Sequence, residues 1–172
     1  PRDIVSCTDT KQLYIADCYS ESGCVWRVSL DGQHVDKWLT NKSTSTTDWT
    51  PYSLSLTSRR LLVTSYNNKE LFLFGADGVE LKHISLLDMN ELRHSVETSR
   101  GTFIVCHNKP QPRVVEVDAD GHEIRFYNNQ QQLGESFYFV LDSDSRLLIA
   151  DYEKHRVLLL NSRLELERVL LD

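Results

Sequence analysis

The chain has 172 residues, with 19 Lys or Arg against 25 Asp or Glu, and its formal net charge at pH 7 is −6. A hydrophobic fraction of 40% with 26% charged residues excludes a disordered tail and predicts a folded protein with its own core. Every apolar run is far shorter than the ~20 residues of a membrane helix, so we predict no membrane partner. The cysteine usage described below leads us to expect a cytoplasmic protein. The sequence begins at Pro1 without Met or an apolar leader, and we therefore expect a piece of a longer polypeptide.

Short apolar runs recur along the chain at a nearly constant spacing. They begin at Leu13, Leu61, Phe103 and Leu147, in steps of 48, 42 and 44 residues. A turn pair follows each run: Asp31-Gly32, Asp77-Gly78, Asp120-Gly121 and, in the fourth place, Ser162-Arg163. Two independent markers with one period predict four homologous units, approximately residues 1–50, 51–92, 93–135 and 136–172.

Each unit is predicted to contain four short strands. In the first unit these cover approximately residues 3–6, 13–16, 25–30 and 34–39, and turns rich in Asp, Gly, Ser and Thr separate them. Residues 85–96 are the nearest helix candidate, because apolar residues recur there. This segment lies where the other units are connected to one another, so we expect at most one helical turn.

The apolar pattern of the strands predicts sheets that are covered on both faces. The second strands carry consecutive apolar residues, which is typical of strands buried on both sides. Counted back from the turn pair, large apolar pairs recur in the third strands: Trp26 and Val28, Phe72 and Phe74, Val115 and Val117, Val157 and Leu159. Four-stranded sheets of this period, stacked against copies of themselves, are the blades of an all-β protein, the β-propeller.

Residues 147–157 resemble the signature of the NHL repeat, with Ala150-Asp151, a short polar loop and then His155-Arg156 before an aliphatic strand. Residues 13–28 are similar, with Ala16-Asp17 and Arg27-Val28. The middle units depart from the pattern, because Thr64-Ser65 and Cys106-His107 replace Ala-Asp. The resemblance implies a propeller like the C-terminal one of tripartite-motif ubiquitin ligases, which recruits proteins or RNA and performs no chemistry.

Propellers of this family usually close with six blades, and this sequence contains four. Four NHL-like blades leave two apolar sheet faces without a neighbour, and large exposed apolar patches are association surfaces. We therefore expect the chain to be part of a larger, six-bladed ring or to be completed by another chain, which would include self-association through the unpaired blade faces. A closed ring of four blades is the remaining alternative.

Acidic and histidine side chains are the candidates for chemistry. Asp17 and Asp151 end the second strands of their units, and this repetition predicts a scaffold role in binding loop N–H groups. His155 is interpreted in the same way, as part of the repeat. His107 replaces the Asp in the third unit, but the six histidines share no metal-ligand spacing, so we predict no metal and no cofactor.

The sequence contains no nucleophile elbow and no phosphate-binding glycine loop. We therefore predict no catalytic residue, with a propeller enzyme (a lyase or a lactonase-like hydrolase) as an alternative. Cys18 and Cys24 flank a short loop and could form a disulfide in an oxidising compartment, whereas Cys7 and Cys106 are expected in buried strands. We predict four reduced thiols, and we note a glycosylation sequon at Asn41.

RNA is the rival to a protein partner, because some propellers of this kind bind it. The four units carry net charges of −2, −1, −1 and −2, so none is basic. Phosphate binding needs several Lys or Arg side chains on one face, and the even negative charge disfavours it. A protein partner is the prediction that remains.

We predict that this partner binds the rim formed by the loops between second and third strands and by the connections between units. Tyr19, Tyr66 and Tyr152 recur within a residue of the same place in these loops, and Asn108 lies in the corresponding loop of the third unit. Tyrosine is a favoured contact residue because it presents a large area for little loss of rotamer entropy. Trp49, in the first connection, is a further candidate. The alternatives are tyrosines that pack over loop backbone and a tryptophan that plugs the space between blades.

Overall fold

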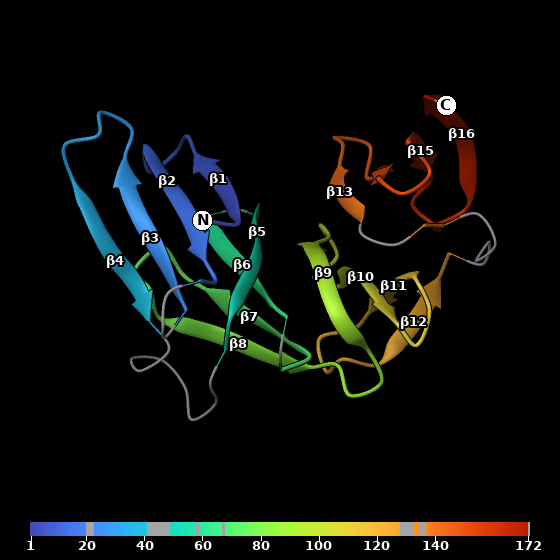
Figure 1. The fold of residues 1–172 in the computed structure, drawn as a ribbon, viewed down its shortest axis with the longest axis horizontal. Coiled ribbons are helices and arrows are strands. Elements are labelled where there is room, and N and C mark those ends of the chain that lie inside the picture. Colours follow the sequence, from blue (N-terminus) through green and yellow to red (C-terminus); the bar gives the residue numbers. More distant parts are fainter. Residues whose placement is uncertain are drawn as a thin grey trace. The chain divides into compact units, whose positions relative to one another are not determined.

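The computed structural model describes residues 1–19, 23–40, 49–57, 59–66, 68–127, 133–134 and 137–171. The described residues form four antiparallel sheets of four strands each, and each sheet follows the chain order (Figure 1). This confirms the predicted all-β fold of four blades. None of the described residues forms a helix of the length and hydropathy needed to cross a bilayer.

The chain forms two compact units, Pro1–Ser85 and Leu86–Asp172. In unit 1, blade 1 contains β1 (Asp3–Cys7), β2 (Gln12–Asp17), β3 (Cys24–Ser29) and β4 (Val35–Thr40), and blade 2 contains β5 (Pro51–Thr57), β6 (Arg60–Ser65), β7 (Glu70–Phe74) and β8 (Glu80–Ser85). In unit 2, blade 3 contains β9 (Asn90–Glu97), β10 (Phe103–Lys109), β11 (Arg113–Val117) and β12 (Glu123–Phe126), and blade 4 contains β13 (Phe137–Leu141), β14 (Leu147–Asp151), β15 (Arg156–Leu160) and β16 (Leu166–Leu171).

The segment at residues 85–96 is a turn followed by a strand. The Met89 N–H donates to the Leu86 carbonyl over 3.0 Å, and β9 begins at the next residue. The expectation of no more than one helical turn is therefore confirmed. The predicted division between the second and third blades, at residue 93, falls inside β9.

The core of unit 1 lies between one face of blade 1 and one face of blade 2. The second and third strands of blade 1 contribute Tyr14, Ala16 and Val25, and its first and last strands add Cys7 and Leu39. The second and third strands of blade 2 contribute Leu61, Val63, Phe72 and Phe74, its first strand adds Leu54, and all five residues are buried. Burial of each such side chain contributes about 1.5–3 kcal/mol, so this face holds the two blades together.

The core of unit 2 has the same construction. Ile104, Cys106 and Val114 of blade 3 face blade 4, and the connection between these blades adds Tyr127 and Leu133. The second and third strands of blade 4 contribute Leu147, Ile149, Leu158 and Leu160, and Phe139 and Leu164 of the same blade add to the core. In both units, therefore, the later blade presents alternate residues of its second and third strands to the earlier blade.

The third strand of blade 4 corrects the predicted alignment by one residue. Leu158 and Leu160 lie opposite Ile149 and Leu147, as Phe72 and Phe74 lie opposite Val63 and Leu61 in blade 2. Val157 and Leu159, which the sequence placed in this role, point to the other face, because a shift of one residue reverses the faces of a strand.

The cause of this shift is the last turn of blade 4. The residue with a left-handed backbone in this turn is Leu164, with φ of 63°, and its N–H donates to the Asn161 carbonyl over 2.9 Å. The equivalent residues of the other blades are the glycines Gly32, Gly78 and Gly121. Ser162-Arg163 therefore lies one residue before the true equivalent of the Asp-Gly pairs.

The first turn of each blade also contains one residue with positive φ. These residues are Lys11, Arg59, Gly101 and Ser145. In blades 1, 3 and 4 the N–H of this residue donates to the carbonyl three residues earlier. The period that predicted the blades therefore recurs in the backbone conformation of their turns.

Candidate partner-binding rim

The strand order of each sheet places the candidate loops at one end of the blade. In an antiparallel sheet that follows chain order, the first and third turns lie at one end, and the second loop and the exit of the last strand lie at the other. We call this second end of each blade the loop rim. In the described residues it includes 18–19 and 23 of blade 1, 66 and 68–69 of blade 2, 110–112 of blade 3 and 152–155 of blade 4.

Asp151 organises the loop rim of blade 4. Its carboxylate is buried and accepts hydrogen bonds from the Gly134 N–H at 3.1 Å and from Arg156 at 3.0 and 3.1 Å. In blade 1, Asp17 accepts hydrogen bonds from the Tyr19 N–H at 3.3 Å and from the Trp26 indole at 3.4 Å. Both carboxylates are thus bonded within their own unit, which is the geometry of a scaffold residue.

Tyr19 and Tyr152 present their side chains to solvent. Their exposed fractions are 78% and 75%, and they follow Asp17 and Asp151 by two residues and one residue. The Tyr152 ring lies 6.2 Å from the His155 ring, centroid to centroid, in an edge-to-face arrangement. These two predicted contact residues are therefore accessible, each at the loop rim of its blade.

Tyr66 of blade 2 is half-buried and has a different environment. Its ring stacks on Tyr52 with centroids 5.1 Å apart, and its N–H donates to the Thr50 carbonyl over 3.3 Å. The Arg2 guanidinium lies 4.4 Å from the centre of the Tyr52 ring and donates to the Tyr52 hydroxyl. Tyr66 therefore belongs to a packed cation–aromatic group, and it packs on another aromatic ring, whereas the alternative considered for the tyrosines was packing over loop backbone.

Two predicted contact residues are buried, and the structure corrects their assignment. Trp49 is fully buried and packs against Phe72 and Phe74, with ring centroids 5.7 and 6.1 Å apart. It is the plug between blades 1 and 2. Asn108 is only 1% exposed, because β10 continues to Lys109 and places this residue inside the strand instead of the loop.

His107 is a buried imidazole at the end of β10. Its Nδ1 lies 2.9 Å from the Lys109 carbonyl, and its buried Nε2 has no hydrogen-bond partner among the described residues. Burial lowers the pKa of His107, so the ring is neutral at physiological pH.

All four cysteines are free thiols. Cys7 and Cys106 are buried, as expected, and burial raises the pKa of the Cys106 thiol. Cys24 is also buried, whereas Cys18 is partly exposed. The sequon at residues 41–43 and the centre of the loop between Cys18 and Cys24 lie outside the described residues.

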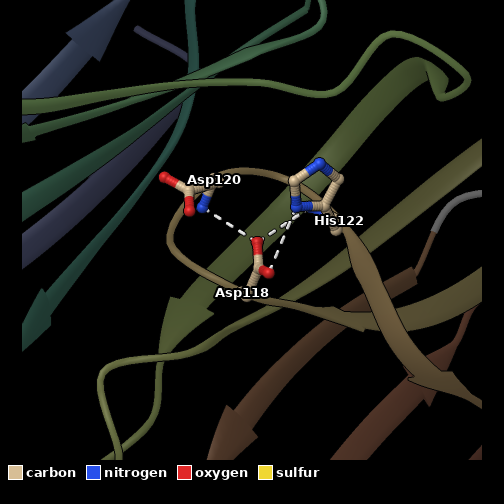
Figure 2. Close-up of side chains that lie close together, drawn as sticks. All are labelled: Asp118, Asp120 and His122. Atoms are coloured by element: carbon tan, nitrogen blue, oxygen red, sulfur yellow. Dashed lines mark hydrogen bonds and ion pairs between the residues drawn. The ribbon is translucent and has the colours of Figure 1, made fainter.

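A cluster of Asp118, Asp120 and His122, which the sequence analysis did not identify, lies in the turn between β11 and β12 (Figure 2). Asp118 Oδ1 accepts the N–H groups of Asp120 and His122 at 2.8 and 2.9 Å, and these bonds lower the pKa of Asp118. In the sequence, the spacing Asp-x-Asp-x-His would have pointed to these three residues. Asp142 and Asn161 cap turns of blade 4 in the same way, so the arrangement is a repeated turn cap.

Similarity to known proteins is found at the level of three-dimensional structure. No protein-family model matches the chain, and no curated protein matches it. A chain in the crystal structure of the nidogen/laminin complex is similar, with a TM-score of 0.71 and 22% identity over 93% of this chain and 60% of that one. The streptogramin B lyase structure has a TM-score of 0.72 and 15% identity over 97% and 53%. The WD40 β-propeller domain of Doa1 has a TM-score of 0.57 and 16% identity over 99% and 68%.

These similarities show that the chain has a β-propeller fold. It spans 60% of the matched nidogen/laminin chain and about half of the matched lyase chain. At such low identities the likeness concerns the fold, and function has to be argued from the residues at the rim.

Proposed function

We propose that this chain is a non-catalytic interaction module of a cytoplasmic β-propeller protein, and that it recruits a protein partner through the loop rim. The exposure of Tyr19 and Tyr152 is the observation that carries the proposal. A tyrosine ring held in solvent on a rigid sheet combines a large apolar area with a polar tip, the composition typical of contact residues in protein interfaces.

The resemblance of β14 and β15 to the NHL repeat supports a recruiting propeller of the tripartite-motif type. In that resemblance the Asp-Arg pair is part of the blade scaffold, and the loops around it bind the partner. Asp151 and Arg156 have the geometry that this role requires, since their ion pair is buried below the exposed Tyr152 loop. The proposed contact residue thus rests on a fixed base.

Charge pairing supports a protein partner over RNA. In the part of the chain that the structure describes, many arginines form ion pairs with carboxylates, among them Arg27, Arg59, Arg93, Arg100, Arg113, Arg125, Arg146 and Arg156. Binding a phosphate would require a guanidinium to exchange its carboxylate for the ligand. The electrostatic gain that drives RNA binding is smaller for such a surface.

Site-specific photo-crosslinking in cells tests the proposal. A benzophenone amino acid replaces Tyr19 or Tyr152 in turn, and Gln33 or Asp120, exposed in turns at the opposite end of their blades, serves as the matched control. We expect the same protein to be crosslinked at positions 19 and 152 and to be absent at 33 and 120, as identified by mass spectrometry.

The variants Tyr19→Ser and Tyr152→Ser complete this test. We expect each to reduce capture of that protein by at least ~5-fold, as for an interface contact worth about 1 kcal/mol, with an unchanged melting temperature. Crosslinks to RNA instead of protein would favour the rival partner. A marked fall in melting temperature would show that these rings are structural and would refute the proposal.

A further inference from the structure

Blade 1 is buried on one face and open on the other. The face formed by Leu13, Ile15, Trp26 and Val28 is only partly covered, although the equivalent four residues of blade 2 are all buried. Ile4 and Val35 extend this face and are 56% and 60% exposed. We call it the first-blade open face.

The first-blade open face also contains a hollow. A concavity of about 340 Å³ is lined by Ile15, Trp26, Val28 and Val35, with Pro1 and Asp17 at its edge. The Lys37 ammonium lies 5.1 Å from the centre of the Trp26 ring. Apolar surface with a depression of this kind favours the burial of apolar side chains from another sheet.

Blade 4 is open on its opposite face. Leu148, Ala150 and Val157 lie on this face with Tyr138 and Val140, and the exposed fraction of Val140 is 58%. The register places Leu171 beside Val157, so the face extends to the last strand. We call it the last-blade open face.

The two open faces correspond to the two sides of the contact that holds successive blades together. The first-blade open face is equivalent to the face that blade 2 packs against blade 1 and to the face that blade 4 packs against blade 3. Leu148, Ala150 and Val157 are equivalent to Tyr14, Ala16 and Val25, which cover blade 2 within unit 1. A single chain therefore presents both complementary sides of the contact between successive blades.

We propose that this chain associates with a second copy of itself head to tail, so that the last-blade open face of one copy packs on the first-blade open face of the other. The contact is heterologous, because different patches of the two copies meet. It reproduces between copies the packing of blade 1 on blade 2. The proposal is independent of Tyr19 and Tyr152, which lie on loops and not on these faces.

Sedimentation of the purified chain tests the proposal together with three variants. Val35→Glu places a charge on the first-blade open face and Val140→Glu on the last-blade open face, whereas Val79→Glu changes a similarly exposed valine of blade 2 and is the matched control. We expect the parent chain and Val79→Glu to have a molecular mass in solution of no less than twice the 19.9 kDa of one chain. Each of the other variants should associate at least ~10-fold more weakly, because an interface excludes water from the new charge.

Mixing the two defective variants gives the decisive result. Val35→Glu retains an intact last-blade face and Val140→Glu retains an intact first-blade face. Their equimolar mixture should therefore form a one-to-one dimer at a concentration at which each variant alone associates much more weakly. A parent chain that is monomeric throughout would overturn the proposal and indicate that further blades of a longer polypeptide cover these faces. A mixture that stays monomeric, or a symmetric contact that only one variant disrupts, would overturn it as well. Circular dichroism of every variant confirms that the sheets are retained.

Discussion

Blades 1 and 4 carry the same short motif, and they use it differently. Asp17 and Asp151 both end the second strand, but Asp151 is paired with Arg156 in the buried interior whereas Asp17 bonds to Trp26 and to its own loop. The arginine of blade 1, Arg27, pairs with Asp36 of the neighbouring strand at 3.2 Å. A similar order of residues has therefore produced two different ion pairs.

Strand register explains the difference. Asp151 lies opposite Arg156, whereas Asp17 lies opposite Cys24, because the loop of blade 1 is two residues longer in the sequence. Arg27 lies three residues further along β3 than Cys24, opposite Tyr14, and therefore on the other face of the strand. The residue that faces the Asp across the ladder therefore decides whether the buried Asp–Arg ion pair forms.

Replacing the equivalent carboxylates of the two blades should give the largest difference in the free energy of unfolding. Asp151→Asn leaves Arg156, with a side chain that is 14% exposed, without its counter-charge, and we expect a loss of about 3 kcal/mol in the free energy of unfolding. Asp17→Asn should lose less than about 1 kcal/mol, because its bonds are long and its carboxylate is partly exposed. Urea denaturation of both variants measures these values, and equal losses would contradict the distinction.

The last turns of the same two blades should reveal a smaller difference, about 1 kcal/mol between two variants of Leu164. Leu164 combines a left-handed backbone with a buried side chain, so Leu164→Ala loses packing and keeps the strain, about 3 kcal/mol in all. Leu164→Gly loses the same packing but relieves about 1 kcal/mol of strain, and it should be the more stable of the two variants.

Gly32 provides the control for that order. A Cβ added at Gly32 meets no atom within 4 Å, and φ is 72°, so Gly32→Ala should cost about 1 kcal/mol for backbone strain alone. Thermal or urea denaturation ranks the three variants. If alanine proved more stable than glycine at position 164, the left-handed assignment of this turn would be wrong.

Lowering the pH should reveal the smallest difference between the two blades, in the contribution of their last turns to the melting temperature. The pKa of Asp31 is held below its usual range by hydrogen bonds from the Ser29 hydroxyl and the Gln33 N–H, whereas Asn161 caps the equivalent turn of blade 4 and does not titrate. A carboxyl with a lowered pKa stabilises the fold above its ordinary value of 3.8, and this contribution is lost as the pH falls further. Asp31→Asn should therefore flatten the fall in melting temperature below pH ~4. An unchanged acid profile would show that the turn of blade 1 does not depend on this charge.

The blades were predictable from the sequence because their strands carry alternating or continuous apolar residues between recognisable turns. Predicted and observed strands of the first blade agree within two residues, and the run beginning at Leu147 coincides with the start of β14. Where a glycine marks the left-handed residue of the turn, the alignment of the third strands is also correct. At Leu164 no glycine is present, and the alignment slipped by one residue.

The candidate contact surface was less predictable, because a sequence does not distinguish an exposed aromatic residue from a buried one in a connection. Tyr19 and Trp49 both lie in connections between strands, but the tryptophan fills the space beside Phe72. Asn108 has the composition of a loop residue and lies inside a strand, because β10 is irregular between Cys106 and His107 and continues to Lys109. Tertiary packing overrode the local signal in both places.

The left-handed residues of the first turns bear on how such repeats diverge. Lys11, Arg59, Gly101 and Ser145 share a backbone conformation, although their side chains range from two long cations to a hydroxyl group and a single hydrogen atom. The hairpin hydrogen bond tolerates many side chains at this point. Mutation can therefore remove the sequence similarity between blades while their backbone dihedral angles stay the same. A search for ancestry in this lineage would gain more from comparing backbone torsions than from comparing residues.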